Sequence, residues 1–222
     1  MEKQDILKVV RANEGTVLSF PDRGPWGNNR YRGNCSGYIH AFLIDQYNVN
    51  YMAEMYAGGG TGYDVCKDMQ VKYVGADINP APVRPDIYVC NALVDEIPEE
   101  FSEADFIFQH MPYPEIGIKY AGSEYADPDG RLKSQDIGQM NFTKGMQANN
   151  KVTMKLYNAM HPGAKNFLRY IRLSEKQSLN LEKSFIRHCL GNFYSQLSDN
   201  KEKRCENGNE KLSDQSRITA FL

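Results

Sequence analysis

The stretch Tyr51–Asn79, YMAEMYAGGGTGYDVCKDMQVKYVGADIN, decides the fold. An apolar strand over 51–56 is followed by a glycine turn from Gly58 to Gly62, a short helix, and a second strand, VKYVGAD, that ends at Asp77. The glycine break and the β-branched or aromatic residues on either side of the helix predict a βαβ unit. In such units a ligand lies at the carboxyl ends of the strands, where glycine lets the backbone approach and an acidic residue meets a ribose.

The pattern around this unit predicts an α/β fold with a mostly parallel sheet flanked by helices. Further strand-like segments, IYVCNAL and DFIFQHMPY, follow it, so that strands end at 56, 77, about 90 and 109 with helices or connectors between them. This alternation is typical of a parallel sheet, and we therefore expect a Rossmann-like fold. Amphipathic spacing predicts helices at 2–12, 37–47 and 150–160.

The last third of the chain departs from this alternation. Residues 114–149 show no lasting period and predict a long polar loop, which in a compact domain is usually functional or disordered. After Gly163 the one strand-like segment is FLRYIRL, basic and alternating, and the tail beyond about Ser198 has the composition of disorder. We expect a ligand-binding core over 1–163 and a divergent, basic, helical or disordered segment over 164–222. The C-terminal part of the fold is thus atypical, and incomplete if no closing strand forms there.

The arm before the second helix is rich in glycine, asparagine and arginine. It is either a functional loop or an arm packed on the sheet edge by Trp26 and Tyr31. Ser36 or Asn34 is placed to cap the following helix, whose amino end would point toward the glycine turn. We expect His40 to be a surface or packing residue.

Composition narrows the class of protein. The chain has 222 residues, no apolar run approaching the roughly 20 residues of a membrane span, and an N-terminus without the pattern of a signal peptide, so we expect a cytoplasmic protein without a membrane partner. The five cysteines are scattered without a C-x-x-C pair, which supports neither disulfides nor a zinc site. We expect them to be reduced and mostly packed as small apolar groups. The oligomeric state is not predicted.

The net charge of −2 hides an uneven distribution. Residues 35–150 carry seven Lys/Arg against seventeen Asp/Glu, whereas residues 151–222 carry thirteen against seven. An acidic middle is a poor surface for polyanions, while a basic end could follow a phosphate backbone. A solvated basic tail explains the same counts.

The spacing of the glycines excludes two common ligands. From Gly58 the sixth position of a G-x-G-x-x-G fingerprint is Tyr63, and from Gly60 it is Val65, so the dinucleotide pattern fails. The absence of G-K-[ST] excludes a Walker phosphate loop. What remains is G-x-G-x-G, preceded by Glu54 and followed at the next strand end by an aspartate.

This arrangement suits a neutral nucleoside joined to an amino acid. Asp77 can accept both ribose hydroxyls, and Glu54 can favour an ammonium group. S-adenosylmethionine has these parts, and we expect it to be the cofactor.

A second motif, His110-Met111-Pro112-Tyr113, ends the fourth strand. Together with AGGGTG and RGNCSGYI, it resembles the amino-methyltransferases that modify exocyclic nitrogens of DNA bases. In these enzymes [D/N/S]-P-P-[Y/F/W] follows the cofactor motif, and some relatives that look like adenine methylases have an H-P-P-Y form. The resemblance covers roughly 32–163. His110 and Met111 depart from the usual first two positions of the tetrapeptide.

The resemblance implies a methyltransferase form of the Rossmann-like fold and roles for particular residues. Tyr113 would stack on an extruded base, the carbonyl of Met111 would accept one amino hydrogen, and the side chain of His110 would accept the other. Pro112 completes the catalytic motif. The cofactor would be held by Asn34, Ser36, Glu54, Tyr56, Ala57, Gly58, Gly60, Gly62, Asp77, Ile78 and Asn91. Neither a metal nor a covalent nucleophile is implied.

The resemblance implies transfer of a methyl group to an exocyclic amino nitrogen of a DNA base, and we expect adenine N6 to be the target. The loops Gly24–Asn34 and Lys119–Lys144 are candidate contacts to nucleic acid. Two alternatives stay open. One is a degenerate or truncated relative without activity, which the change of character after Gly163 would explain. The other is methylation of an RNA base or a protein amide.

Overall fold

The structure is a computed structural model of the chain. It describes residues 1–13, 18–20, 22–28, 31, 34–114, 135–169 and 219–221. These residues belong to one compact unit, formed by 1–170 and 216–221, while a second unit over 171–215 lies outside the described residues. The predictions for 171–215 and for most of the 114–149 loop therefore fall outside the described part of the chain.

Helices and strands alternate along the described chain as the pattern predicts. The elements in order are α1 (Lys3–Arg11), α2 (Gly37–Tyr47), β1 (Tyr51–Met55), α3 (Thr61–Met69), β2 (Lys72–Asp77), β3 (Ile87–Val89), the 3-10 turn η1 (Glu99–Glu103), β4 (Phe106–His110), the 3-10 turn η4 (Ile137–Gln139), α4 (Phe142–Ala159), β5 (Lys165–Arg169) and β6 (Thr219–Phe221). The strands form one sheet in the order β3-β2-β1-β4-β5-β6, and each neighbouring pair is parallel. The prediction of an α/β fold with a parallel sheet is confirmed.

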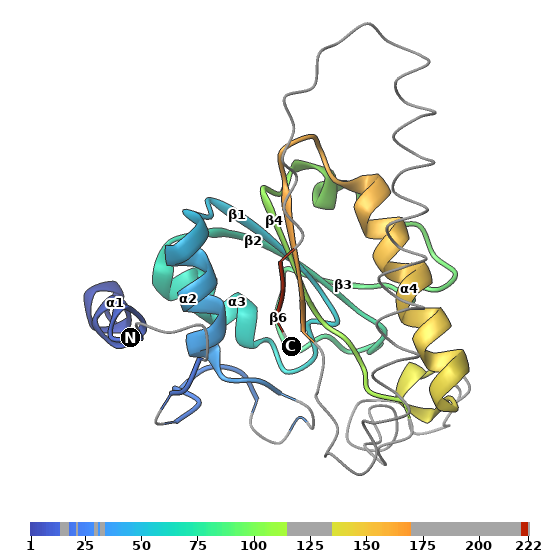
Figure 1. Ribbon diagram of the computed structural model, residues 1–222, viewed down its shortest axis with the longest axis horizontal. Helices are drawn as coiled ribbons and strands as arrows, with labels where there is room; N and C mark the ends of the chain where they lie inside the picture. The colour runs from blue at the N-terminus through green and yellow to red at the C-terminus, as the bar shows by residue number, and fades with distance from the viewer. Residues whose placement is uncertain are drawn as a thin grey trace, which may run out of the picture. The chain divides into compact units, whose positions relative to one another are not determined.

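Helices cover both faces of the sheet (Figure 1). On one face, α1, α2 and α3 pack against alternate residues of the central strands, such as Met52 and Phe108. On the other face, α4 and η1 pack against the intervening residues of the same strands, such as Ala53 and Ile107. Because side chains alternate along a strand, each central strand contributes to both cores.

The strand order places a crevice in the middle of the sheet. The chain runs outward from β1 through β2 to β3, then returns to the other side of β1 with β4 and continues to β5. The connections on the two sides of β1 therefore diverge at its carboxyl end. In open parallel sheets this reversal point is where ligands bind.

The start of α4 is the main difference from the expected elements. The sequence pattern places this helix at 150–160, but it begins at Phe142. Asn141 caps it, because its side chain accepts a hydrogen bond from the backbone N–H of Lys144. The first turns are polar and contain Gly145, so they lack the apolar spacing on which the prediction rests.

The sheet also continues past residue 163, where the expected core ended. β5 pairs with β4 over its whole length, from Phe106 opposite Lys165 to His110 opposite Arg169. Buried polar groups join these strands to α4: the side chain of Gln109 donates to Asn166 at 2.8 Å and accepts from Thr153 at 3.3 Å. The strand-like character noted after Gly163 thus belongs to a strand of this sheet.

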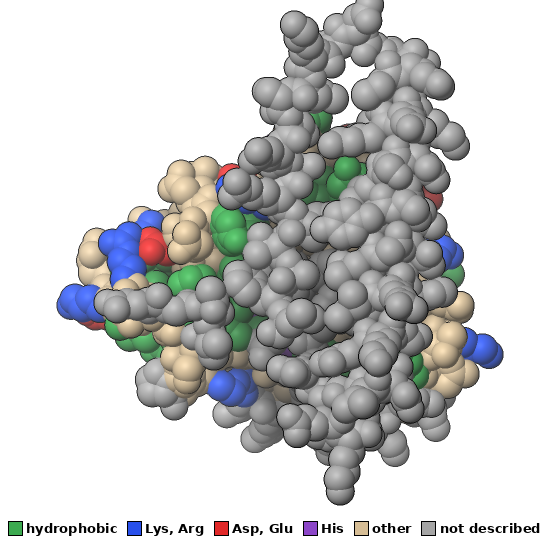
Figure 2. All heavy atoms as spheres, viewed as in Figure 1, with side chains coloured by type: hydrophobic (Ala, Val, Ile, Leu, Met, Phe, Trp, Pro, Cys, Tyr) green, Lys and Arg blue, Asp and Glu red, His purple; other side chains and the backbone are tan. Residues whose placement is uncertain are grey.

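Charged side chains on the described surface are partly paired. On the face drawn in Figure 2, the Lys and Arg side chains lie at separate places, and near α1 they adjoin carboxylates. Two ion pairs lie there, Lys8 with Asp5 at 3.0 Å and Arg11 with Asp45 at 2.6 Å. In the part of the chain that is described, no helix has both the length and the apolar character needed to cross a membrane.

Candidate ligand pocket

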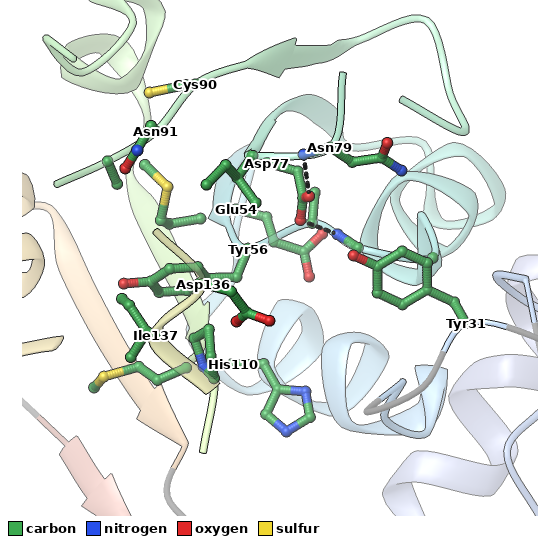
Figure 3. A pocket seen from close by; sticks show the side chains of 18 of the residues that line it. Tyr31, Glu54, Tyr56, Asp77, Asn79, Cys90, Asn91, His110, Asp136 and Ile137 are labelled. Atoms are coloured by element: carbon green, nitrogen blue, oxygen red, sulfur yellow. Dashed lines mark hydrogen bonds between the residues drawn. The ribbon is translucent and has the colours of Figure 1, made fainter. Parts of the chain in front are cut away.

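A hollow lies at the carboxyl ends of β1, β2, β3 and β4, at the reversal point of the sheet. Its empty volume is about 1000 Å³, including space open to solvent, and Figure 3 shows side chains from several strands and loops around it. Of the residues that the sequence assigns to a site, its wall contains Asn34, Glu54, Tyr56, Ala57, Gly58, Asp77, Ile78, Asn91, His110, Met111 and Pro112.

Asp77, at the end of β2, fixes two loops and still has capacity to bind a ligand. One carboxylate oxygen accepts the backbone N–H of Gly58 at 2.8 Å, and the other accepts that of Asn79 at 2.9 Å (Figure 3). A carboxylate oxygen can accept about two hydrogen bonds. Each oxygen of Asp77 can therefore accept one more, which is the number that the two hydroxyls of a ribose require.

The backbone that enters the glycine turn is strained at one residue, Tyr56. Tyr56, a non-glycine residue, has φ of 68°, and Gly58 and Gly60 have φ of 48° and 76°. The left-handed region is costly for a residue with a side chain, and such strain is typical of functional sites. The N–H groups of Tyr56 and Ala57 both donate to the carbonyl of Ala76, which ties the turn to β2.

Two of the three glycines assigned to the cofactor lie behind the wall rather than in it. A Cβ on Gly60 would be 2.7 Å from Cγ of Arg84, on the side of the loop after β2. A Cβ on Gly62 would collide with the carboxylate of Glu54. Gly60 is therefore needed for its left-handed conformation, and Gly62 leaves the space that Glu54 occupies.

Glu54 already has hydrogen-bond partners for both oxygens. His40 of α2 contacts Oε1 through Nε2 at 2.9 Å, and the hydroxyl of Tyr73 donates to Oε2 at 2.6 Å. His40 and Glu54 are buried and Tyr73 is half-buried, and the His40 ring packs on Phe108 with centroids 4.1 Å apart. Of the two roles expected for His40, surface residue or packing residue, the structure shows packing. His40 also binds a carboxylate.

Three carboxyl groups, Glu54, Asp77 and Asp136, surround the pocket (Figure 3). Burial raises the pKa of Asp77, and the nearby charges of Glu54 and Asp136 raise it further, against hydrogen bonds from two backbone N–H groups that lower it. This mutual repulsion would be relieved by a positively charged ligand. Among the described residues no cluster of three His, Cys, Asp or Glu side chains has the arrangement of a metal site.

The tetrapeptide 110–113 turns away from the sheet at the end of β4. His110, Met111 and Pro112 line the pocket, and the Pro112 carbonyl accepts a hydrogen bond from the Asn149 side chain of α4 at 3.1 Å. Tyr113 is 8 % exposed and lies outside the lining. It is hydrogen-bonded through its hydroxyl to Nε2 of His110, with the two rings edge to face at 5.4 Å.

The arm before α2 packs on the core through Trp26 and also binds the glycine turn, so its contacts fit both interpretations of this loop. The backbone N–H of Asn28 donates to the carbonyl of Gly59 at 2.8 Å, and the Asn34 side chain bonds to the hydroxyl of Thr61. Trp26 is buried over α2 and α3, where its indole N–H donates to Asp68 at 2.8 Å. Parts of both loops assigned to nucleic acid lie outside the described residues.

The expected cap of α2 is only half right. Ser36 occupies the N-cap position, but its side chain makes no capping bond and donates instead to the carbonyl of Asp22 at 3.2 Å. Asn34 is engaged with the glycine turn.

The side chain of Asn91, which follows β3, bonds to Gln135 across the pocket rim.

Several wall residues were missed by the sequence interpretation. They are Tyr31, Cys35, Met55, Gly59, Thr61, Asn79, Cys90, Ala92, Leu93, Gln135, Asp136 and Ile137. Cys35 stands inside the RGNCSGYI motif, which could have singled it out. Asp136 has the local signal of an Asx turn, D-I-G, in which it accepts the N–H of Gly138 at 2.9 Å, but nothing local brings it to this pocket.

Comparison with known proteins assigns no family to the chain. No protein-family model matches it, and no curated protein sequence matches it. The class that can be stated is therefore structural: an α/β protein with a parallel sheet and an acidic pocket at the reversal point of its strands.

Proposed function

We propose that this protein binds S-adenosylmethionine in the pocket and transfers its methyl group to an exocyclic amino nitrogen of a DNA base, adenine N6 in the first instance. The observation that carries the proposal is the convergence of Asp77, the glycine turn and residues 110–112 on one hollow. These are the two motifs that resemble the DNA amino-methyltransferases. The methyltransferase form of the Rossmann-like fold is part of the proposal.

The polar groups of the wall suit the parts of this cofactor. Asp77 has one free acceptor position on each oxygen for the two ribose hydroxyls. The sulfonium and ammonium groups are cations, and the three carboxyl groups around the pocket favour positive charge. Ile78 and Leu93 offer apolar surface to the adenine ring.

The transfer side consists of residues 110–112. The amino nitrogen of the base attacks the methyl carbon with its lone pair, the carbon–sulfur bond breaks with its electrons remaining on sulfur, and the nitrogen then loses a proton to water. The backbone carbonyl of Met111 and the side chain of His110 orient the amino group. Positioning of this kind can supply roughly 7–11 kcal/mol of the barrier.

A protein that binds the cofactor without transferring the methyl group is the second candidate, and Tyr113 favours it. The ring that would stack on the base is buried and hydrogen-bonded to His110. Stacking on a base, worth roughly 1–3 kcal/mol, must compete with that contact.

The test is incubation of the full chain with methyl-labelled S-adenosylmethionine and duplex DNA, single-stranded DNA, RNA or a protein extract. We expect label on adenine in DNA. Tyr113→Ala should reduce transfer at least tenfold while cofactor binding is kept. Tyr88→Ala, at an exposed tyrosine outside the pocket, is the control and should leave transfer unchanged.

The possible results separate the candidates. Cofactor binding without label on any acceptor supports the binding protein, and label on RNA or on a protein amide moves the activity to another substrate. Lack of cofactor binding by a folded chain overturns the proposal.

A further inference from the structure

Cys35 lies in the pocket wall next to a chain of titratable side chains. Its Sγ is 3.9 Å from Nδ1 of His40, and Nε2 of the same ring is 2.9 Å from Oε1 of Glu54. The side chains are 7 %, 0 % and 3 % exposed. One imidazole thus joins a thiol on the pocket wall to a buried carboxylate, which is the arrangement that activates a cysteine nucleophile.

Side chains from several elements contact or act on Cys35, His40 and Glu54. His40 is on α2 and Glu54 on β1, and His110, at the end of β4, also lowers the pKa of the Cys35 thiol. Tyr73 of β2 donates to the second oxygen of Glu54. Cys35 also lies directly before Ser36, the N-cap of α2, and the amino end of a helix favours negative charge.

The charges favour a thiolate beside an imidazolium. Burial alone would raise the pKa of Cys35, but His40 and His110 lower it to about 5. Burial alone would lower the pKa of His40, but the Cys35 thiolate and the Glu54 carboxylate raise it to about 10. Near neutral pH the sulfur is therefore charged.

The other described cysteines differ in their surroundings. Cys90 lines the same pocket and is 5 % exposed, nearly the same as Cys35. Its Sγ faces the carbonyl of Glu96, and burial together with Asp95 raises its pKa. Cys66 is fully buried with a raised pKa. Cys90 is therefore a control with matched exposure in the same molecule.

We propose that Cys35 is a nucleophilic thiolate, positioned by His40 and Glu54, that forms a thioether with small molecules carrying an activated alkyl carbon when they enter the pocket. A sulfur lone pair forms the sulfur–carbon bond, and the leaving group departs with the electrons of the bond that breaks. The imidazolium keeps its proton. The reaction needs no oxidant and does not depend on the proposed methyl transfer.

Limiting iodoacetamide is the probe, with iodide as the leaving group and peptide mass spectrometry as the readout. A thiol with a low pKa is more often ionised but intrinsically less nucleophilic, by roughly 0.4–0.5 log units per pKa unit. At pH 5.5 we expect Cys35 to react roughly tens of times faster than Cys90, because a thiol with a pKa near or above its usual value is almost wholly protonated. At pH 7.5 the ratio should fall to about one.

Substitutions separate activation from simple access. Cys35→Ser should remove the label from its peptide. Glu54→Gln should move the midpoint of the Cys35 rate profile to higher pH, and His40→Gln should move it further in the same direction, since only His110 then remains to lower the pKa of Cys35. Thermal melting identifies a variant that fails to fold, and in that case the two wild-type profiles decide. The proposal is overturned if Cys35 and Cys90 in the wild-type protein react with the same pH profile.

Discussion

Asp77 shows how one buried side chain can serve both the fold and the site. Its two oxygens hold the first residue of the glycine turn and the loop after β2 in place. The same oxygens face the pocket. This double role was predictable in outline, because an acidic residue at the end of the strand after a glycine turn has a local signature. Its geometry depends on the packing of β1 against β2.

Cys35 and His40 lead to a prediction about stability and pH. The pKa of His40 is raised from 6.5 to about 10. Its contribution to the free energy of unfolding is therefore complete below pH 6.5 and is lost as the pH rises through 10. The pKa of Cys35 is lowered from 9.0 to about 5, so its contribution is complete above 9 and is lost as the pH falls through 5. Between pH 6.5 and 9 the two slopes have opposite signs and cancel.

The part of the free energy of unfolding that depends on Cys35 and His40 should therefore be constant from pH 6.5 to 9. It should fall outside this range by about 1.4 kcal/mol per pH unit toward pH 5 and toward pH 10. Urea unfolding from pH 5 to 10, compared with Cys35→Ala, measures this part as a difference. If the difference is flat over the whole range, the thiolate–imidazolium pair does not exist.

At the scale of elements, the local pattern was sufficient where one stretch of chain forms the whole unit. The β1–α3–β2 unit was predicted because its strands, turn and helix follow one another. The start of α4 was missed because capping by Asn141, rather than an apolar period, sets it. The group of Cys35, His40 and Glu54 was missed because its members come from different elements, and only packing of α2 on β1 brings them together.

Gly62 tests the contact between α3 and β1. Intrinsic helix propensity alone predicts that Gly62→Ala stabilises the protein by up to about 1 kcal/mol. In the structure the added Cβ would be 2.8 Å from Cδ of Glu54, which also holds His40 and Tyr73. We expect the opposite sign, a loss of roughly 1–3 kcal/mol, as is usual for overpacking.

The measurement is urea unfolding of Gly62→Ala beside Lys67→Ala. Lys67 is exposed on the same helix, and lysine and alanine differ little in helix propensity. We expect the control to change stability by less than about 0.5 kcal/mol. A more stable Gly62→Ala protein would mean that Glu54 can leave its position freely.

At the scale of the whole molecule, the order of the sheet explains why distant segments share one pocket. The sequence shows where strands end. It does not show that β4 lies directly beside β1, or that β2 separates β3 from β1. Once that order is known, residues 77, 91 and 110 must gather at one edge, because parallel strands end on the same side. Asp136 reaches the edge through the turn before α4, and no strand pattern could place it there.

The acidity of the pocket is likewise a property of the assembled molecule. The excess of acidic residues in the middle of the chain was visible in the sequence. Their gathering was not, since Glu54, Asp77 and Asp136 come from three separate segments. A pocket with this charge should bind a cation better than an anion of similar size, which bears directly on the choice of cofactor.

Ligand binding should raise the stability of the whole chain by an amount that can be calculated. A ligand at about 100 times its dissociation constant stabilises the folded state by about 2.7 kcal/mol. For a chain of 222 residues, this corresponds to a rise in Tm of roughly 5–11 °C. We expect S-adenosylmethionine to produce this rise, and we expect NADH and ATP to produce none, because the glycine spacing suits neither and both are anions.

Asp77→Asn is the informative variant for this measurement. The amide keeps one acceptor oxygen and places an NH₂ group where the carboxylate received a backbone N–H, so both the ribose contacts and the turn are weakened. The shift with S-adenosylmethionine should disappear. Asp86→Asn, at an exposed aspartate outside the pocket, should keep it. An equal shift in both variants would place the cofactor elsewhere on the chain, whereas a shift with NADH would mean that the pocket has been assigned to the wrong class of ligand.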